Sequence, residues 1–185
     1  ISIGMFVEPS TAVSWRGPLL HRTIQQFLTD VYFGDLDVLV LDLPPGTGDV
    51  AISLGQLLPH AEVLVVTTPQ PAAAEVAERS GLVARQTGQT VIGVVENMAG
   101  LAQPDGTVLE VFGSGGGAEL ASRLDVPVLA SIPLSVELRR DGDTGEPAVL
   151  AHPEDPAARA ISALAEQLAR RGRGLAGRKL PVSSR

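Results

Sequence analysis

The 185-residue chain contains no cysteine, and this absence excludes several kinds of chemistry at once. Such a chain forms no disulfide, offers no thiolate ligand to a metal and has no cysteine nucleophile. Aromatic residues make up only 3% of the chain, so the core has to be built from aliphatic side chains. No apolar run is long enough to span a bilayer, and no signal-peptide pattern opens the chain. We therefore expect a cytoplasmic protein with no membrane partner.

Basic residues are few and unevenly placed. The only lysine is Lys179, and the residues around it lack the spacing and the hydroxyl group of a phosphate-binding loop. Residues 170–185 contain six basic and no acidic residues, whereas the preceding residues contain eight basic and 21 acidic ones, a net charge of −13. An acidic surface repels nucleic acid, so no nucleic-acid partner is expected. The pattern predicts one domain at 1–169 and a disordered basic tail at 170–185.

Hydrophobic periodicity predicts an α/β fold. Short aliphatic runs are typical of buried strands, and apolar residues at three- and four-residue steps are typical of amphipathic helices. Strands are expected at 38–43, 62–68, 91–95 and 126–132, with a short one at 108–112. Helices are expected at 18–31, 50–58 (capped by Asp49), 72–86, 118–124, 136–140 and 156–168, and loops at 100–107 and 141–147. This alternation predicts a doubly wound, mostly parallel sheet with helices on both faces.

The stretch at 37–49, DVLVLDLPPGTGD, is the most informative part of the chain. It predicts a buried strand that ends at Asp42 and is followed by a glycine-rich turn. Ligands of open α/β sheets bind at the carboxyl ends of strands, and an ionised carboxylate on a core strand is costly without a cationic partner. Asp42 is therefore predicted to face a Mg²⁺-bound phosphate or an attacking water. The alternative is a strand end at which Asp42 accepts hydrogen bonds from its own turn.

Two other predicted strands also end in polar or turn-forming residues. Asn97 follows the strand at 91–95, and Pro133 and Leu134 follow the strand at 126–132. In a parallel sheet these ends meet at one edge, and the Asn97 carboxamide suits the edge of a purine base. An ordinary turn residue is the alternative for Asn97. The glycine run at 113–118 fits a dinucleotide fingerprint only weakly and is better interpreted as a flexible loop that enters a helix.

Seven motifs, taken together, resemble the Mrp family of P-loop ATPases, which is related to MinD and ParA and is known for iron–sulfur cluster carriers. They are WRGP at 15–18, LDLPPGTGDV at 41–50, VVTTPQ at 65–70, VVENM at 94–98, VFGSGGG at 111–117, SIPL at 131–134 and DGDTGEP at 141–147. The basic tail is similar to that of actinobacterial members.

The resemblance implies specific roles for five residues. Asp42 would be the switch II aspartate that holds Mg²⁺ through water, and Gly46 would sense the γ-phosphate. Asn97 would bind the adenine, and Pro133 and Leu134 would line the base pocket. The resemblance also implies ATP and Mg²⁺ as cofactors, a homodimer as the working form, and apoprotein clients that receive iron–sulfur clusters.

The chain departs from the family pattern in three places. The phosphate loop with its two lysines is absent, as is the switch I aspartate, and both are expected upstream of Ile1. Without that loop, this segment is expected to be an incomplete domain and inactive by itself. The Cys-x-x-Cys that many members carry after ENM is replaced by AGLAQPDG at 99–106, so thiolate binding of a cluster is impossible in this chain. Ser135 stands where relatives commonly have aspartate.

Three functional hypotheses therefore stay open. The intact protein is either an ATP-dependent iron–sulfur cluster carrier or a nucleotide-gated MinD/ParA-like interaction protein without a cluster. The third hypothesis is an inactive fragment that lacks the phosphate loop.

Overall fold

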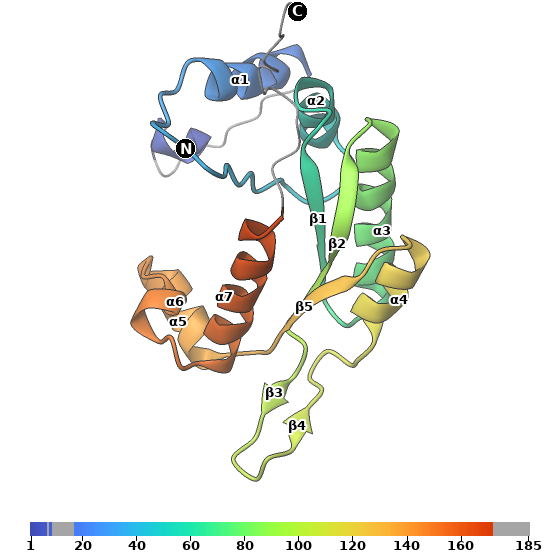
Figure 1. Ribbon diagram of the computed structural model, residues 1–185, viewed down its shortest axis with the longest axis vertical. Helices are drawn as coiled ribbons and strands as arrows, with labels where there is room; N and C mark the ends of the chain where they lie inside the picture. Colours follow the sequence, from blue (N-terminus) through green and yellow to red (C-terminus); the bar gives the residue numbers. More distant parts are fainter. Residues whose placement is uncertain (7, 9–16, 172–185) are drawn as a thin grey trace, which may run out of the picture. The chain divides into compact units, whose positions relative to one another are not determined.

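The computed structural model describes residues 1–6, 8 and 17–171 (Figure 1). Its contacts divide the chain into two compact units, Ile1–Val63 with Glu78–Val91, and Leu64–Ala77 with Ile92–Arg185. Most of the tail predicted at 170–185 lies outside the described residues. The elements are, in chain order, η1 (Ile3–Met5), α1 (Pro18–Thr29), α2 (Asp49–Leu57), β1 (Glu62–Thr67), α3 (Pro71–Gln86), β2 (Thr90–Asn97), β3 (Leu101–Ala102), β4 (Val108–Leu109), α4 (Gly116–Arg123), β5 (Val128–Ile132), α5 (Val136–Thr144), α6 (Ala148–Ala151) and α7 (Pro156–Ala169).

The first unit is built around the contact between α1 and α2. Pro18 occupies the first turn of α1, where its missing N–H costs nothing. The rings of Phe6 and Phe27 lie 6.4 Å apart and pack the start of the chain on this helix. The prediction that Asp49 caps α2 is wrong, because Gly48 is the cap residue and Asp49 is the first helical one. The Asp49 carboxylate instead accepts the Gly17 N–H at 3.3 Å, which ties α2 to the start of α1.

The prediction of a buried strand at 38–43 is also wrong. This segment is neither helix nor strand, and neither sheet of the described residues includes it. Its apolar side chains are exposed, Val40 by 83% and Val38 by 64%. A strand is stable only when a neighbour satisfies its backbone groups, and no described strand pairs with this one. Asp42 is accordingly exposed and is not the buried carboxylate that the sequence argument assumed.

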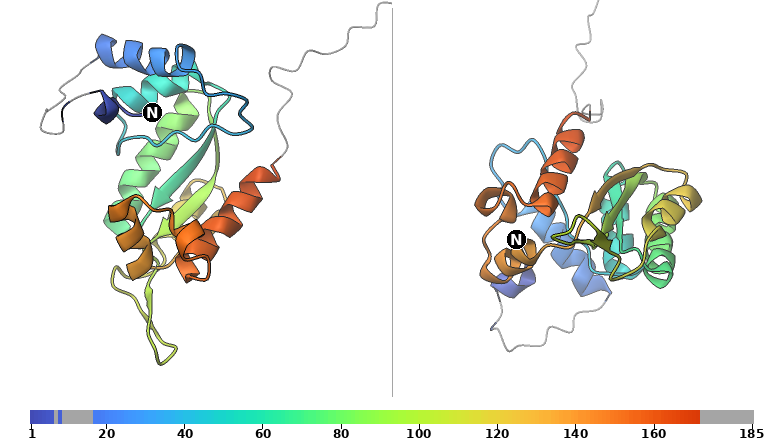
Figure 2. Two further views of the ribbon diagram at one scale, coloured as in Figure 1. Left: turned by 90° about the vertical axis from the view of Figure 1, so that its left-hand side faces the viewer. Right: turned by 90° about the horizontal axis from the view of Figure 1, so that it is seen from below.

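The sheet belongs largely to the second unit, and its strand order is β1-β2-β5. β2 and β5 are parallel, with Val95 paired to Ala130 and Asn97 to Ile132. Helices α4 and α7 lie on opposite faces of these strands (Figure 2). On the α7 face, Val95 and Ile132 form a core cluster with Ala157, which is fully buried. The predicted mostly parallel sheet with helices on both faces is confirmed.

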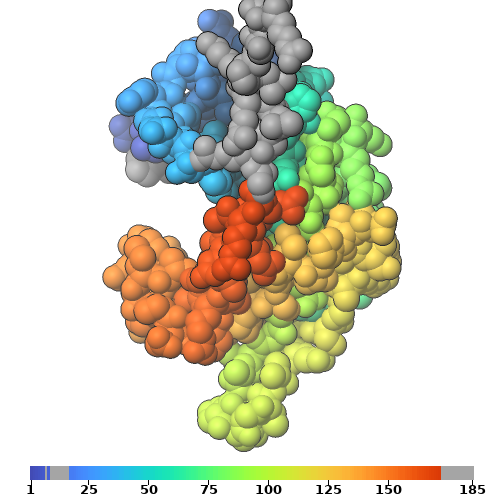
Figure 3. All heavy atoms as spheres, viewed as in Figure 1, coloured from blue at the N-terminus to red at the C-terminus, as the bar shows by residue number. Residues whose placement is uncertain are grey.

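The segment at 100–107, predicted as a loop, forms most of a hairpin. β3 and β4 are antiparallel, with Leu101 opposite Leu109, and the hairpin projects from the rest of the second unit (Figure 3). Asp105 holds the turn by accepting both the N–H and the hydroxyl of Thr107, and these bonds lower the pKa of its carboxyl group. The hairpin therefore has local support, although Val108 and Leu109 remain exposed.

Helix α5 extends into the segment that was predicted as a loop at 141–147. It continues to Thr144 and ends at Gly145, whose left-handed conformation (φ 75°) is typical of a helix terminus. An ion pair four residues apart, Arg139 with Asp143 at 2.7 Å, supports the last turn. None of the helices among the described residues is long and apolar enough to cross a membrane.

Candidate nucleotide-binding site

The ends of β2 and β5 bring three predicted site residues together in the second unit. Asn97 is paired with Ile132, the residue before Pro133. Beyond the strands the two segments of the chain stay in contact, because the Ala99 N–H donates to the Ile132 carbonyl at 3.0 Å. The Leu134 N–H likewise donates to the Gly100 carbonyl at 2.7 Å. Asn97, Pro133 and Leu134 therefore lie side by side at one edge of the sheet.

The Asn97 side chain is oriented by its own backbone. Its Oδ1 accepts the Met98 N–H at 2.9 Å, and Met98 has a left-handed conformation (φ 59°) that a non-glycine residue seldom adopts. This bond leaves the amide N–H groups and one oxygen lone pair for a ligand. A carboxamide held in this way can present a donor and an acceptor to the edge of a base.

The hydroxyl groups at the end of β1 are occupied within the turn. Thr67 is buried, and its hydroxyl donates to the Thr68 carbonyl at 3.2 Å. The Thr68 hydroxyl donates to Oε1 of Gln70 at 3.1 Å. These bonds support the start of α3 and leave Asn97 as the more available polar group at this edge.

Glu96, directly before Asn97, makes contacts that the sequence reasoning missed. Its Oε1 accepts the Gly117 N–H at 2.7 Å, and its Oε2 accepts the Ser131 hydroxyl at 3.1 Å. The only available signal was a second polar residue at a strand end.

The glycine run was predicted as a flexible loop that enters a helix, and the helix is confirmed as α4. The glycines at its start, Gly116 and Gly117, however, allow α4 to pack closely on the strand ends.

Asp42 and Gly46 belong to the first unit. Both are in the segment without regular structure, and the Asp42 side chain is exposed. Gly46 has a left-handed conformation (φ 95°) that favours glycine, and its carbonyl accepts the Ser80 hydroxyl at 3.4 Å. An exposed carboxylate beside such a turn can hold Mg²⁺ through water. The roles predicted for these two residues stay predictions, as does their convergence with Asn97.

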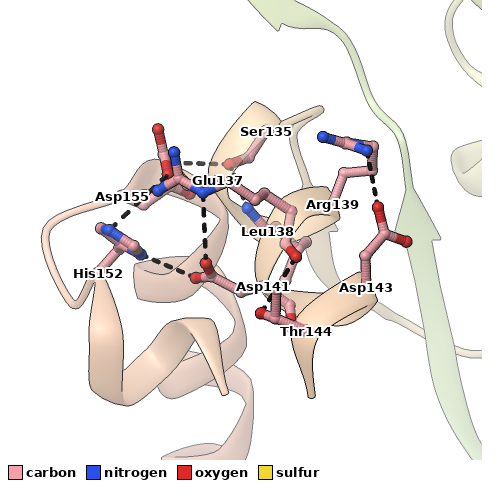
Figure 4. A network of polar contacts seen from close by, with 10 residues as sticks. Ser135, Glu137, Leu138, Arg139, Asp141, Asp143, Thr144, His152 and Asp155 are labelled. Carbon is pink, nitrogen blue, oxygen red and sulfur yellow. Dashed lines mark hydrogen bonds and ion pairs between the residues drawn. The ribbon is translucent and has the colours of Figure 1, made fainter. Parts of the chain in front are cut away.

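Ion pairs link α5 to the segment after α6 (Figure 4). The buried Asp141 carboxylate lies 2.8 Å from Nδ1 of His152, and this bond, more than any other contact, raises the pKa of the imidazole. Glu137 and Asp141 also lie beside Arg140. The side-chain ligand atoms of Glu137, Asp141 and His152 lie within 4.8 Å of one another. Because Arg140 already compensates both carboxylates, this cluster is explained as an ion-pair network.

Ser135 lies at the edge of the same network. Its hydroxyl oxygen accepts the Leu138 N–H at 3.0 Å and so caps α5. The hydroxyl also donates to Oδ2 of Asp155 at 2.8 Å. The position therefore has a structural role, although aspartate was expected there from the family pattern.

Comparison with known proteins identifies the family. The model of the ParA family, described as NUBPL iron-transfer P-loop NTPases, matches residues 1–169. The chain belongs to this family. The resemblance drawn from the seven motifs is thereby confirmed.

Individual relatives agree with this assignment. The chain is 59% identical over 186 residues to an iron–sulfur cluster carrier protein of Mycobacterium bovis, an alignment that covers 97% of the chain and 49% of that protein. Among solved structures, it is similar to a nucleotide-binding protein from Archaeoglobus fulgidus in complex with ADP (34% identity, TM-score 0.63, covering 76% of this chain and 57% of that one). It is also similar to the cell division ATPase MinD of Pyrococcus furiosus (26% identity, TM-score 0.58, covering 80% of this chain and 56% of that one). The chain thus spans about half the length of the relatives it matches.

Proposed function

We propose that the protein, in its full natural length, binds ATP with Mg²⁺ and acts as an iron–sulfur cluster carrier that delivers clusters to apoproteins as a nucleotide-dependent homodimer. The observation that carries the nucleotide part is the meeting of Asn97, Pro133 and Leu134 at one sheet edge. The family match and the similarity to a mycobacterial iron–sulfur cluster carrier protein support the carrier part.

The base and the phosphates would be bound by different parts of the chain. The Asn97 carboxamide would read the adenine edge, and Pro133 and Leu134 would supply apolar walls for the ring. Asp42 would orient the water shell of Mg²⁺, and Gly46 would contact the γ-phosphate through its backbone. Phosphoryl transfer is catalysed mainly by charge neutralisation and positioning. The described residues contain no lysine for that purpose, so the neutralising lysines would come from elsewhere in the full-length protein.

These 185 residues offer no thiolate ligand to an iron–sulfur cluster, because the chain has no cysteine. Iron–sulfur clusters are held by cysteine thiolates, with histidine as an occasional substitute. The three histidines of the chain are separated by 39 and 92 residues and do not lie in one cluster of metal-ligating side chains in the described structure. Thiols outside this chain would therefore have to hold the cluster.

The ATPase assignment is tested by Asp42→Asn in the full-length protein. Loss of the carboxylate removes a charge that organises the metal and the attacking water, a contribution of several kcal/mol. We expect steady-state ATP hydrolysis to fall by about 100-fold or more. The matched control is Asp35→Asn, which removes another exposed carboxylate from the same segment and is expected to leave turnover unchanged. Turnover of Asp42→Asn equal to that of the wild type would refute the assignment.

A second function, nucleotide-gated association without a cluster, is favoured by the missing cysteines. In this case ATP would control dimerisation in the manner of MinD-like proteins, and no iron would be carried.

Anaerobic reconstitution of the full-length protein with iron and sulfide distinguishes the two functions. The carrier predicts visible absorbance typical of a cluster and stoichiometric bound iron and sulfide, and alkylation of thiols elsewhere in the protein should abolish both. The alternative predicts no bound cluster, together with ATP-dependent dimerisation in size-exclusion chromatography. A cluster that survives complete alkylation would contradict the thiolate requirement stated above.

A further inference from the structure

The start of α4 packs directly on the ends of the strands. A Cβ atom at Gly116 would lie 2.4 Å from the Pro69 carbonyl oxygen, just after β1. A Cβ atom at Gly117 would lie 2.7 Å from Cβ of Glu96, near the end of β2. Both distances are far below van der Waals contact, so neither position tolerates a side chain without a shift of its neighbours. The glycine-rich segment is thus required for close approach.

The Glu96 carboxylate lies at the amino-terminal end of α4. It accepts the Gly117 N–H at 2.7 Å, and a helix start favours negative charge because its N–H groups are unpaired. Its other oxygen accepts the Ser131 hydroxyl of β5 at 3.1 Å. One side chain therefore connects β2, β5 and α4, and the anion bound at this helix start is the protein's own carboxylate.

These bonds bear directly on the position of Asn97. Glu96 and Asn97 are consecutive residues of β2, so their side chains point to opposite faces of the sheet. Ser131, the partner of Glu96, is two residues before Pro133 in the same segment. A shift of Glu96 relative to Ser131 would therefore move Asn97 relative to Pro133 and Leu134, the predicted walls of the base pocket.

We propose that Glu96 is a positioning residue for base recognition, which it controls by fixing the end of β2 against β5 and α4. Glu96 itself does not touch the nucleotide. This inference rests on the proposed function, because it assumes that Asn97 reads the base.

The test measures base preference in the full-length protein. Affinities for ATP, GTP and inorganic triphosphate, each with Mg²⁺, are determined by calorimetry for the wild type and for Glu96→Ala. We expect Glu96→Ala to reduce the preference for ATP over GTP by about tenfold, the equivalent of one well-placed hydrogen bond. Affinity for triphosphate, which has no base, should stay unchanged. A role in general stability alone would weaken all three ligands alike.

Two further variants displace or preserve the same carboxylate. Gly117→Ala places a methyl group against Glu96 and should reproduce the loss of preference. Glu96→Gln should retain most of the preference, because the amide oxygen can accept from Gly117 and the amide N–H can donate to Ser131. The matched control is Glu119→Ala, which removes a carboxylate of α4 that pairs only locally with Arg123. If Glu96→Ala or Gly117→Ala does not fold, Ser131→Ala removes a single bond and should reduce the preference about threefold.

The outcomes separate this inference from the proposed function. Unchanged preference in folded Glu96→Ala, Gly117→Ala or Ser131→Ala overturns the positioning role, and so does an equal loss of all three ligands. A wild-type protein that binds no nucleotide refutes the proposed function and the positioning role with it. Nucleotide binding with adenine preference that does not depend on Glu96 leaves the proposed function intact and refutes the positioning role alone.

Discussion

At the scale of single residues, burial and nearby side chains determine whether a carboxylate forms an ion pair or faces solvent. Asp141 and His152 are 11 positions apart, and no local pattern in the sequence predicts that they pair. The structure buries the Asp141 side chain to 4% exposure and places the imidazole on its carboxylate. Asp42, which the sequence predicted to be a buried carboxylate at a strand end, is exposed instead. Residue type alone could not distinguish these two aspartates, because burial depends on which segments pack over them.

The Asp141–His152 pair predicts a pH-dependent contribution to stability. The hydrogen bond to Asp141 raises the pKa of His152, with a further contribution from the charges of Asp141 and Glu137, while burial and Arg140 oppose it. Asp155 and Glu154 also line the space beside the imidazole. Because the folded-state pKa exceeds the unfolded one, the stabilisation is complete below the unfolded pKa and is lost as pH rises through the folded pKa.

His152→Gln tests this contribution. Urea unfolding should show a larger loss of stability at pH 5.5 than at pH 8.5, relative to the wild type at each pH. His60→Gln, in the turn between α2 and β1, serves as the control and should show no such difference. A loss for His152→Gln that is equal at the two pH values would contradict the assigned ion pair.

At the scale of elements, pairing and capping explain which predictions succeeded. Most helices and three of the main strands were found near their predicted positions, because local apolar periodicity and flanking proline or glycine mark them. The segment at 38–43 is as aliphatic as the confirmed strands, but it pairs with none of the described strands. Helix α6 was missed, since four residues are too few for a periodic signal.

The starts of α5 and α7 are joined by their caps, and this predicts the effect of Asp155→Ala. Asp155 accepts the Ala157 N–H at 2.8 Å and also the Ser135 hydroxyl, which caps α5. Removal of the carboxylate should lower the free energy of unfolding by about 1–2 kcal/mol, as measured by urea denaturation. The control is Glu154→Ala, whose side chain is 93% exposed and whose ion pair with Arg159 should contribute less than about 1 kcal/mol. Equal effects of the two substitutions would argue against the linked caps.

At the scale of the whole molecule, the amino-acid composition limits which metal clusters the chain can bind. The absence of cysteine is a property of the sequence that no fold can change, so these residues cannot bind a cluster through thiolates. The chain spans about half the length of the relatives it matches, and it exposes the apolar side chains of 38–43. The residues predicted to bind the nucleotide differ in their structural support. Asp42 is in a segment that is neither helix nor strand, whereas Asn97 is the last residue of β2.

The sequence by itself determined the family, the α/β alternation and the identity of the residues at the strand ends. These follow from motifs and from periodicity, both of which are local along the chain. The meeting of Asn97 with Pro133 and Leu134 was predicted from the parallel sheet, and the structure supplied its register and hydrogen bonds. Only the tertiary structure decided that 38–43 is not a strand and that Glu96 holds the start of α4. The physical reason is that backbone pairing and the burial of charge depend on contacts between segments far apart in the sequence, which local patterns do not encode.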